Sequence, residues 1–333
     1  MSFGLSWRHC QYLVFKPSPH QPTRKGKRLS IREGWATTAD AINLYYTVRG
    51  EGPSVIFCNG IGVSTASFWQ ASAQALEKVY KLVHWDYRGH GLSDPPRDPE
   101  ALDITRCAKD LAEVMDALDI PEAVVVGHSM GVQVSFEFYR LFPERVRGLV
   151  LVQGSFQRPF DTFMHFTHSA KIFKKISEMV IEYPKLARAV WPMFFPKGTA
   201  NKVARMAGFV HPSLFPEVEL EIYLSHMSKL SPLLFFHLAR HMQKHSAEEL
   251  LEEIDLPALI FAGEKDLFTP VELSVEMYQR MPKAELQLIR HGSHAAFVEQ
   301  PELFWMRMLF FLHHKVADYG LSEEALALVT DRA

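Results

Sequence analysis

The sequence predicts an α/β fold in which a mostly parallel, doubly wound sheet carries an inserted helical cap. The chain has 333 residues and is 47% hydrophobic, which is enough apolar material for one large core. Short apolar runs alternate with helical periods over residues 54–152 and again over 257–316. Between these stretches no strand pattern appears, and aromatic and methionine residues are frequent. Such alternation is typical of right-handed βαβ units, which bind ligands at the carboxyl ends of their strands.

The first 32 residues differ from the rest of the chain in charge. They contain seven Lys and Arg residues and no acidic residue, and Arg8, His9 and Gln11 interrupt the apolar stretch that a secretory signal needs. We therefore expect residues 1–33 to form a basic, poorly ordered N-terminal arm. A targeting role for this arm, or its peripheral contact with a membrane surface, stays open.

The folded part is expected to open with two strands, 35–38 and 42–48, around a turn at Asp40. Ser54–Cys58 is a continuous apolar run, as in a strand that is buried on both faces. The predicted strands that follow are 81–86, 123–126, 147–152, 257–262 and 285–289. The predicted helices are 68–79, 104–118, 131–141, 271–281 and 296–316.

These elements predict how the chain is divided. We expect residues 34–155 and 251–316 to form the α/β core, and residues 156–250 to form the helical cap. Residues 317–333 are expected to form a helical tail. Its helix is predicted to start after Ser322, because an N-cap serine followed by acidic residues stabilises the first turn.

Charge and cysteine content exclude several classes of protein. A formal net charge of −2 provides no overall field to gather nucleic acid, so no nucleic-acid partner is expected. No apolar run approaches the roughly 20 residues that cross a bilayer, so no transmembrane segment is expected. Cys10, Cys58 and Cys107 are too few and too scattered for a disulfide framework or a metal motif. They favour a reducing, cytoplasmic compartment.

A strand–turn–helix motif contains the most informative residue. The apolar strand 123–126 runs directly into Gly127-His-Ser-Met-Gly131, which is followed by helical sequence. Glycines on either side let the chain turn sharply, so that the hydroxyl of Ser129 projects above the sheet edge. The motif predicts a nucleophile elbow.

A serine hydroxyl needs a neighbouring base to act as a nucleophile, and the base needs an acid that orients it. Asp266 follows the strand 257–262, and His294 follows the strand 285–289. Both therefore come to the same sheet edge as Ser129, in the chain order Ser, Asp, His. The three residues are the predicted catalytic triad.

Three nearby residues compete for the acid and base roles. Glu264 lies two residues before Asp266, and Asp161 follows the preceding strand but lies within cap sequence. His291, three residues before His294, is the competing base. Asp266 and His294 are preferred, because the first lies within a turn scaffold and the second heads the final helix.

A glycine-rich turn, Asn59-Gly-Ile-Gly62, follows the strand Ser54–Cys58. Negative charge that develops on a carbonyl oxygen is stabilised by preorganised N–H groups, each worth about 3 kcal/mol. The main-chain N–H groups of Ile61 and Met130 are the predicted donors of this oxyanion hole. An ordinary strand-to-helix loop is the alternative interpretation of the turn.

Together these residues resemble the α/β-hydrolase superfamily, in its cap-bearing branch of serine hydrolases that includes esterases and lipases. The resemblance covers residues 35–316, and Asp86-Tyr-Arg-Gly-His-Gly-Leu-Ser-Asp94 is similar to the family's loop after its fourth strand. It implies the α/β-hydrolase fold and a Ser-Asp-His triad at the positions already derived. Where the family usually has His-Gly before the oxyanion donor, this sequence has Asn59-Gly60.

Other patterns are weaker. His237, His241 and His245 would share one face of a helix, but no glutamate follows His237 as a zinc protease would need. A solvated cap face is preferred, and neither a metal nor a cofactor is expected. Cys58 lies within a buried strand, so we expect an inert thiol.

The predicted activity is hydrolysis of carboxylic esters with an apolar acyl group, through an acyl-enzyme on Ser129. The aromatic cap would cover a small, apolar ester substrate, since each buried methylene contributes about 0.8 kcal/mol. C–C bond hydrolases, lactonases and perhydrolases with the same triad are alternatives, and so is a ligand receptor with a vestigial triad. The sequence leaves the oligomeric state open.

Overall fold

The computed structural model describes residues 31–65, 69, 76–196 and 198–330. Positions 1–30 of the expected arm therefore lie outside the described residues, and so does Cys10. Most of the predicted helix 68–79 also lies outside them. The described end of that range forms the 3-10 helix η2 (Leu76–Lys78).

Eight strands form one sheet, in which neighbours pair in parallel except for the antiparallel pairs at the N-terminal edge. Their order across the sheet is β1 (Arg32–Thr37), β2 (Asn43–Arg49), β4 (Lys81–Trp85), β3 (Ser54–Cys58), β5 (Ala123–His128), β6 (Val146–Val152), β7 (Ala258–Gly263) and β8 (Ala284–Ile289). Because β3 lies between β4 and β5, the chain reverses its direction of travel across the sheet there. This order confirms the predicted doubly wound α/β fold.

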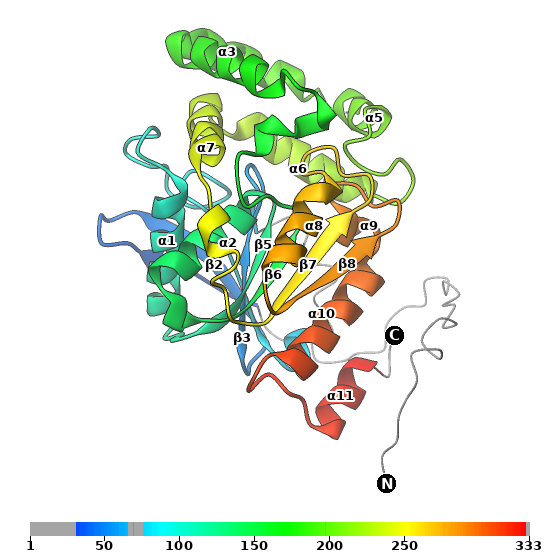
Figure 1. Ribbon diagram of the computed structural model, residues 1–333. Helices are drawn as coiled ribbons and strands as arrows, with labels where there is room; N and C mark the ends of the chain where they lie inside the picture. Colours follow the sequence, from blue (N-terminus) through cyan, green and yellow to red (C-terminus); the bar gives the residue numbers. More distant parts are fainter. Residues whose placement is uncertain (1–30, 66–68, 70–75, 197, 331–333) are drawn as a thin grey trace.

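Helices cover both faces of the sheet (Figure 1). One face is covered by α1 (Ile104–Ala117), α2 (Met130–Leu141) and α8 (Val271–Arg280), and the other by α9 (Ala296–Glu299) and α10 (Pro301–Lys315). Neighbouring residues of β3 enter opposite halves of the core, with Ile56 on the side of α1 and Phe57 on the side of α10. Burial on both faces explains why Val55–Cys58 of this strand are all apolar.

The prediction of one helix over residues 296–316 is wrong, because the helix breaks at Gln300. Residues up to Glu299 belong to α9, α10 starts at Pro301, and Gln300 between them has φ −132° and ψ 63°. Proline has no N–H to donate and disfavours a helical conformation in the residue before it. β1 also starts earlier than predicted, at Arg32, so it includes the last two residues of the expected arm.

Between β6 and β7 the described chain contains helices and no β-strand of the sheet. We call residues 156–250 the cap. An isolated β-bridge between Gln157 and Ser246 joins its two ends. Figure 1 places the cap above the carboxyl ends of the strands, with α3 and α5 farthest from the sheet. The cap contains η4 (Pro159–Asp161), η5 (Phe163–His165), α3 (Ser169–Glu182), α4 (Pro184–Val190), η6 (Trp191–Phe194), α5 (Thr199–Met206), α6 (Glu217–Lys229), α7 (Pro232–Lys244) and η7 (Glu248–Leu250).

The C-terminal segment packs back onto the sheet. The hydroxyl of Tyr319 donates to the carbonyl of Ser54 at 2.6 Å and accepts from the N–H of Val124 at 3.1 Å, so it links β3 to β5. α11 (Glu323–Thr330) follows, and Ser322 Oγ accepts a main-chain N–H of its first turn at 3.2 Å, as predicted for its N-cap. Among the described residues, no helix is long and apolar enough to span a membrane.

A buried arginine ties the loop after β4 to two other elements. Arg88 donates two hydrogen bonds to Asp110 of α1, at 2.7 and 2.8 Å, and binds Asp40 in the β1–β2 turn at 2.7 Å. The Arg88 residue is only 3% exposed. Such bidentate pairs hold the positions of the elements that they join, because both partners have a fixed planar geometry.

Replacing Arg88 by methionine is expected to lower the free energy of unfolding by about 3 kcal/mol, since the buried carboxylate of Asp110 loses a bidentate partner. The matched control is Arg147→Met, because Arg147 pairs with Asp318, which is exposed. That change is expected to cost less than about 1 kcal/mol. Urea unfolding of both variants measures the difference, and equal losses would contradict the structural role of Arg88.

Three buried histidines make stability depend on pH. Burial lowers the pKa of His84 to about 3, that of His90 to about 4 and that of His128 to about 3. The ring of His84 stacks on Phe57 at 4.3 Å, and neither ring nitrogen has a hydrogen-bond partner among the described residues. Between pH 6.5 and these lowered values the unfolded chain binds protons that the folded chain does not, so stability falls as the pH falls.

We expect the His84→Leu variant to lose less stability on acidification than the wild type. From pH 7 to pH 5.5 its free energy of unfolding should fall by about 1 kcal/mol less, because one pKa unit corresponds to about 1.4 kcal/mol. Urea unfolding at the two pH values measures this difference. His291→Leu, which removes an exposed histidine, is the control, and an equal change in that variant would rule out burial as the cause.

Candidate active site

The structure places Ser129 in a sharp turn between β5 and α2. Its φ of 56° and ψ of −116° are strained for a residue with a side chain. The turn requires Gly127 and Gly131, because a Cβ on Gly131 would overlap the carbonyl oxygen of Cys58, and one on Gly127 would overlap the carbonyl of Gly131. The turn presents the Ser129 side chain at the carboxyl edge of the sheet, as the sequence predicts.

The three predicted triad residues come together at this edge. His294 Nε2 lies 2.9 Å from Ser129 Oγ, and His294 Nδ1 lies 2.9 and 3.0 Å from the two carboxylate oxygens of Asp266. His294 follows β8 and Asp266 follows β7. These distances form a continuous hydrogen-bonded relay from carboxylate to imidazole to hydroxyl.

The carboxylate of Asp266 is held from several sides. It accepts hydrogen bonds from the N–H groups of Phe268 at 2.8 Å and Thr269 at 3.0 Å, and from the hydroxyl of Thr269 at 2.9 Å. Its side chain is completely buried. Because its own loop supplies these donors, the carboxylate is oriented toward His294 by local structure.

The competing residues have other partners. Glu264 accepts a hydrogen bond from the N–H of His291 at 2.7 Å, and its carboxylate lies 3.5 Å from His291 Nδ1. Asp161 accepts a hydrogen bond from Gln243 at 2.7 Å within the cap. The structure therefore pairs the competing acid with the competing base, on an exposed loop away from the relay.

The turn after β3 lies directly beside the elbow. A Cβ added to Gly60 would be 3.2 Å from Ser129 Cβ, so the main chain passes close to Ser129. Among the described residues no hydrogen-bond partner is found for the N–H of Ile61 or of Met130, which is the first residue of α2. Gly62 has φ 77°, and Met227 of α6 packs over it from the cap.

Asn59, which stands where a histidine is usual, faces the core. Its side-chain oxygen accepts from Trp69 Nε1 at 2.7 Å, and its amide donates to the carbonyl of Trp85 at 3.3 Å. Its own carbonyl accepts from the hydroxyl of Tyr87 at 3.0 Å. Asn59 thus anchors the turn and leaves the N–H groups that follow it near Ser129.

Two residues of the site were not found from the sequence. His128 lies beside the elbow serine, and its Nε2 donates to the carbonyl of His294 at 2.9 Å. Because burial and the nearby His294 lower the pKa of His128 to about 3, it stays neutral and supports the loop of His294. His128 directly precedes Ser129 in the motif Gly127–Gly131, and this position was the one signal in the sequence that could have identified it.

Phe268 is the second residue of the site that was not found from the sequence. Its ring centroid lies 4.8 Å from that of His294, and 5.1 Å from the rings of both Phe163 and Phe209 in the cap. A separate cavity of about 380 Å³ lies between His165 and Gly208 of the cap and the loop 264–267. Phe268 thus links the imidazole of His294 to aromatic rings of the cap.

His241 of α7, His245 directly after this helix and Cys58 of β3 have local structural surroundings that explain them. The side chains of His241 and His245 contact the carbonyl of Glu100 at 2.8 Å and the carboxylate of Glu137 at 3.3 Å. The described residues contain no group of three His, Cys, Asp or Glu side chains placed to hold a metal ion. Burial raises the pKa of Cys58 to about 12, which keeps the thiol protonated and unreactive.

Comparison with known proteins identifies the family of this chain. A family model described as the alpha/beta hydrolase fold matches residues 53–301. The putative carbamate hydrolase RutD of Caulobacter segnis is 29% identical over 287 residues, which cover 83% of this chain and 98% of that protein.

Solved structures show the same fold. The esterase EaEST from Exiguobacterium antarcticum superposes with a TM-score of 0.66 at 19% identity, over 83% of this chain and 98% of that one. Est816, described as an N-acyl homoserine lactone degrading enzyme, superposes with a TM-score of 0.64 at 21% identity, over 83% and 99%. The family model covers most of the sequence, and the chain therefore belongs to the α/β hydrolase family.

Proposed function

We propose that this protein is a serine hydrolase that acts through a covalent acyl-enzyme. The observation that supports this best is the relay of Asp266, His294 and Ser129, in which both links are 2.9 Å long. His294 takes the proton of Ser129 as the hydroxyl attacks the substrate carbonyl, and it later protonates the leaving group. Water then attacks the acyl-enzyme with His294 again as the base, which releases the acid and restores Ser129.

The oxyanion of each tetrahedral intermediate is proposed to bind between the N–H groups of Ile61 and Met130. The close approach of Gly60 to Ser129 supports this position. Two preorganised donors near the developing charge stabilise it by about 3 kcal/mol each, because they need no reorganisation during the reaction. Asp266 orients the imidazole and stabilises its charged form.

The proposed substrates are small carboxylic esters with an apolar acyl group. Phe268 beside His294, Phe163 and Phe209 from the cap, and Met227 over the oxyanion turn provide the apolar surface that supports this proposal. A carbamate is the second candidate, because the 29% identical relative has the name carbamate hydrolase and its substrate class also undergoes acyl transfer. We also propose a reducing, cytoplasmic location, since Cys58 and Cys107 are free thiols.

The test is turnover of p-nitrophenyl esters from acetyl to long-chain acyl, run beside labelling with a fluorophosphonate. We expect covalent labelling of Ser129 and a rate maximum at one chain length, which reports the size of the acyl pocket. Labelling without ester turnover would indicate that the site acts on another class of substrate. That class would then be sought among p-nitrophenyl carbamates, lactones and substrates with a C–C bond to be cleaved. Neither labelling nor turnover would favour the ligand receptor.

A further inference from the structure

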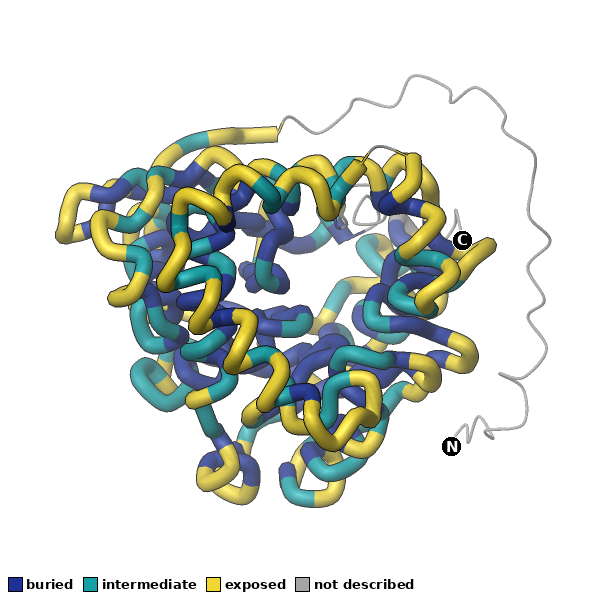
Figure 2. The backbone as a smooth tube through the Cα atoms, turned by 90° about the horizontal axis from the view of Figure 1, so that it is seen from above, coloured by how far each residue is buried: buried dark blue, intermediate teal, exposed yellow. Residues whose placement is uncertain are grey.

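The outermost helix of the cap exposes an apolar stripe. Ile172, Ile176 and Met179 of α3 are 47%, 41% and 57% exposed, and their spacing of four and three residues places them on one face of the helix. α3 is the helix farthest from the sheet in Figure 1, and Figure 2 shows long exposed stretches on the helices of this side. Phe173, which lies about a quarter turn around α3 from this stripe, stacks on Phe160 inside the cap.

The neighbouring cap elements add to this apolar surface. Exposed apolar side chains also occur on α4, η6 and α5, namely Leu186, Met193, Phe194, Val203 and Met206. Met193 is 74% exposed and Met206 is 88% exposed. Single exposed apolar residues are ordinary, but so many on one side of a protein indicate a surface that binds a partner.

The same segment is strongly basic, although the whole chain is not. Residues 162–216 contain eight Lys and Arg residues and two Glu residues, whereas the formal net charge of the protein is −2. Lys171 and Lys175 are exposed on α3 beside the apolar stripe, and Lys174 is exposed with Glu178 at 4.0 Å. A local excess of positive charge therefore accompanies the apolar side chains.

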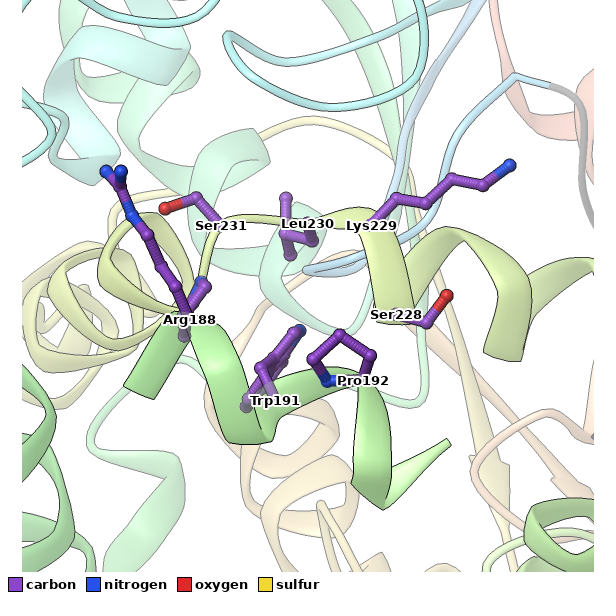
Figure 3. A pocket seen from close by; sticks show the side chains of 8 residues that line it. Arg188, Trp191, Pro192, Ser228, Lys229, Leu230 and Ser231 are labelled. Carbon is purple, nitrogen blue, oxygen red and sulfur yellow. The ribbon is translucent and has the colours of Figure 1, made fainter. Parts of the chain in front are cut away.

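A shallow hollow in this part of the cap has cations at its rim. It has a volume of about 280 Å³ and lies between the end of α4 and the start of α7, with Trp191 and Pro192 among its lining residues. Figure 3 shows Arg188 and Lys229 extending away from each other, on opposite sides of the hollow. Their charges thus add to the basic surface and do not neutralise an acidic side chain of the hollow.

We propose that this outer face of the cap, formed by α3, α4, η6 and α5, binds the surface of an anionic lipid bilayer. Apolar side chains enter the boundary between headgroups and acyl chains, while flanking lysines pair with anionic headgroups. A second copy of the chain fits less well, because a twofold contact through this face would bring two basic segments together. The bound orientation places the cap, which covers the edge of the sheet where Ser129 lies, between the core and the lipid.

The experiment measures co-sedimentation of the full chain with phosphatidylcholine vesicles that contain or lack phosphatidylserine. The protein carries Ser129→Ala, so binding is measured without turnover and does not depend on the proposed function. We expect binding to the anionic vesicles only, weakened by added salt because surface charges are screened. Absence of binding to anionic vesicles would overturn the proposal.

Two sets of substitutions locate the contact. Ile172→Gln, Ile176→Gln and Met179→Gln, combined in one chain, are expected to weaken vesicle binding at least about tenfold, because three apolar side chains no longer enter the bilayer. Lys171→Gln and Lys175→Gln, combined in one chain, are expected to weaken it by a similar factor, since each lysine near an anionic surface contributes several-fold to binding.

The matched control changes a second exposed apolar stripe that lies on α10, far from the cap in Figure 1. Leu303, Met306 and Phe310 are 38%, 49% and 53% exposed, and their replacement by glutamine is expected to leave vesicle binding unchanged. Thermal unfolding and circular dichroism verify that each variant is folded. Equal binding by the α3 variants and the α10 control would overturn the proposal.

The basic arm is tested separately, with Arg24, Lys25, Lys27 and Arg28 replaced by glutamine. If this change abolishes vesicle binding and the α3 variants still bind, the arm makes the contact and the proposal is wrong. Light scattering without vesicles tests the other possible partner of this face, a second copy of the chain. Self-association that requires the α3 stripe would identify a second copy as the partner and would likewise overturn the proposal.

Discussion

Replacing Ser129 by alanine is expected to lower the rate of ester turnover by about 10⁶-fold and to leave the protein folded. The reason is that His294 Nε2, 2.9 Å from Ser129 Oγ, has no hydroxyl left to activate, so no acyl-enzyme forms. The residual rate is expected to come from substrate binding and from the proposed oxyanion donors at Ile61 and Met130, which the substitution leaves in place.

Steady-state kinetics with the best p-nitrophenyl ester measures this loss. The control is Ser228→Ala, which removes a cap hydroxyl that donates to the carbonyl of Ser225, and it should retain the wild-type rate within a few-fold. Alanine tolerates the backbone of residue 129 as well as serine does, so thermal unfolding should show little change. A Ser129→Ala enzyme that keeps more than about a hundredth of the wild-type rate would exclude a serine nucleophile at this position.

Replacing Asp266 by asparagine is expected to lower kcat by about 10⁴-fold. The carboxylate accepts from His294 Nδ1 at 2.9 Å and from three donors of its own loop. An amide of the same shape would present N–H groups to some of these donors, or to the imidazole. It would then favour the tautomer of His294 that carries its proton on Nε2 and cannot accept the proton of Ser129.

Glu264→Gln is the matched control for Asp266→Asn, because both changes replace a carboxylate by an amide in the same loop. Glu264 pairs with His291 outside the relay, so kcat should change by no more than a few-fold. The pH dependence of kcat/KM adds a second readout, since it reports the essential acid and base of the free enzyme. A large loss in Glu264→Gln with little loss in Asp266→Asn would reverse the assignment of the acid.

Much of the fold was predictable because its signals are local. Val55–Cys58 is apolar at every position since both faces of the strand are covered, and this pattern is visible in consecutive residues. The elbow likewise depends on Gly127–Gly131, where two glycines accommodate the strained backbone of Ser129. The break before Pro301 is also encoded locally, because proline restricts the residue that precedes it. It was not predicted because the apolar periodicity continues across the break.

The residues that the sequence did not identify act over long distances along the chain. His128 supports the carbonyl of His294, which is 166 positions away, and Phe268 connects His294 to the cap residues Phe163 and Phe209. Neither role has a periodic pattern, since each arises from packing between segments that only the complete fold brings together. The basic charge of residues 162–216 is different, because it is visible in the sequence itself and is masked only when charges are summed over the whole chain to −2.

The sequence by itself determined the doubly wound α/β fold, the nucleophile elbow at Ser129 and the two loops that could provide the acid and the base. Only the tertiary structure decided which residue of each loop joins the relay to Ser129, and it brings Asp266 and His294 into that relay while Glu264 and His291 pair at the surface. The physical reason is that the sequence pattern locates a loop at the end of a strand but does not distinguish residues two or three positions apart within that loop. Their side chains differ in direction, and direction is set by the hydrogen bonds and packing of the folded loop.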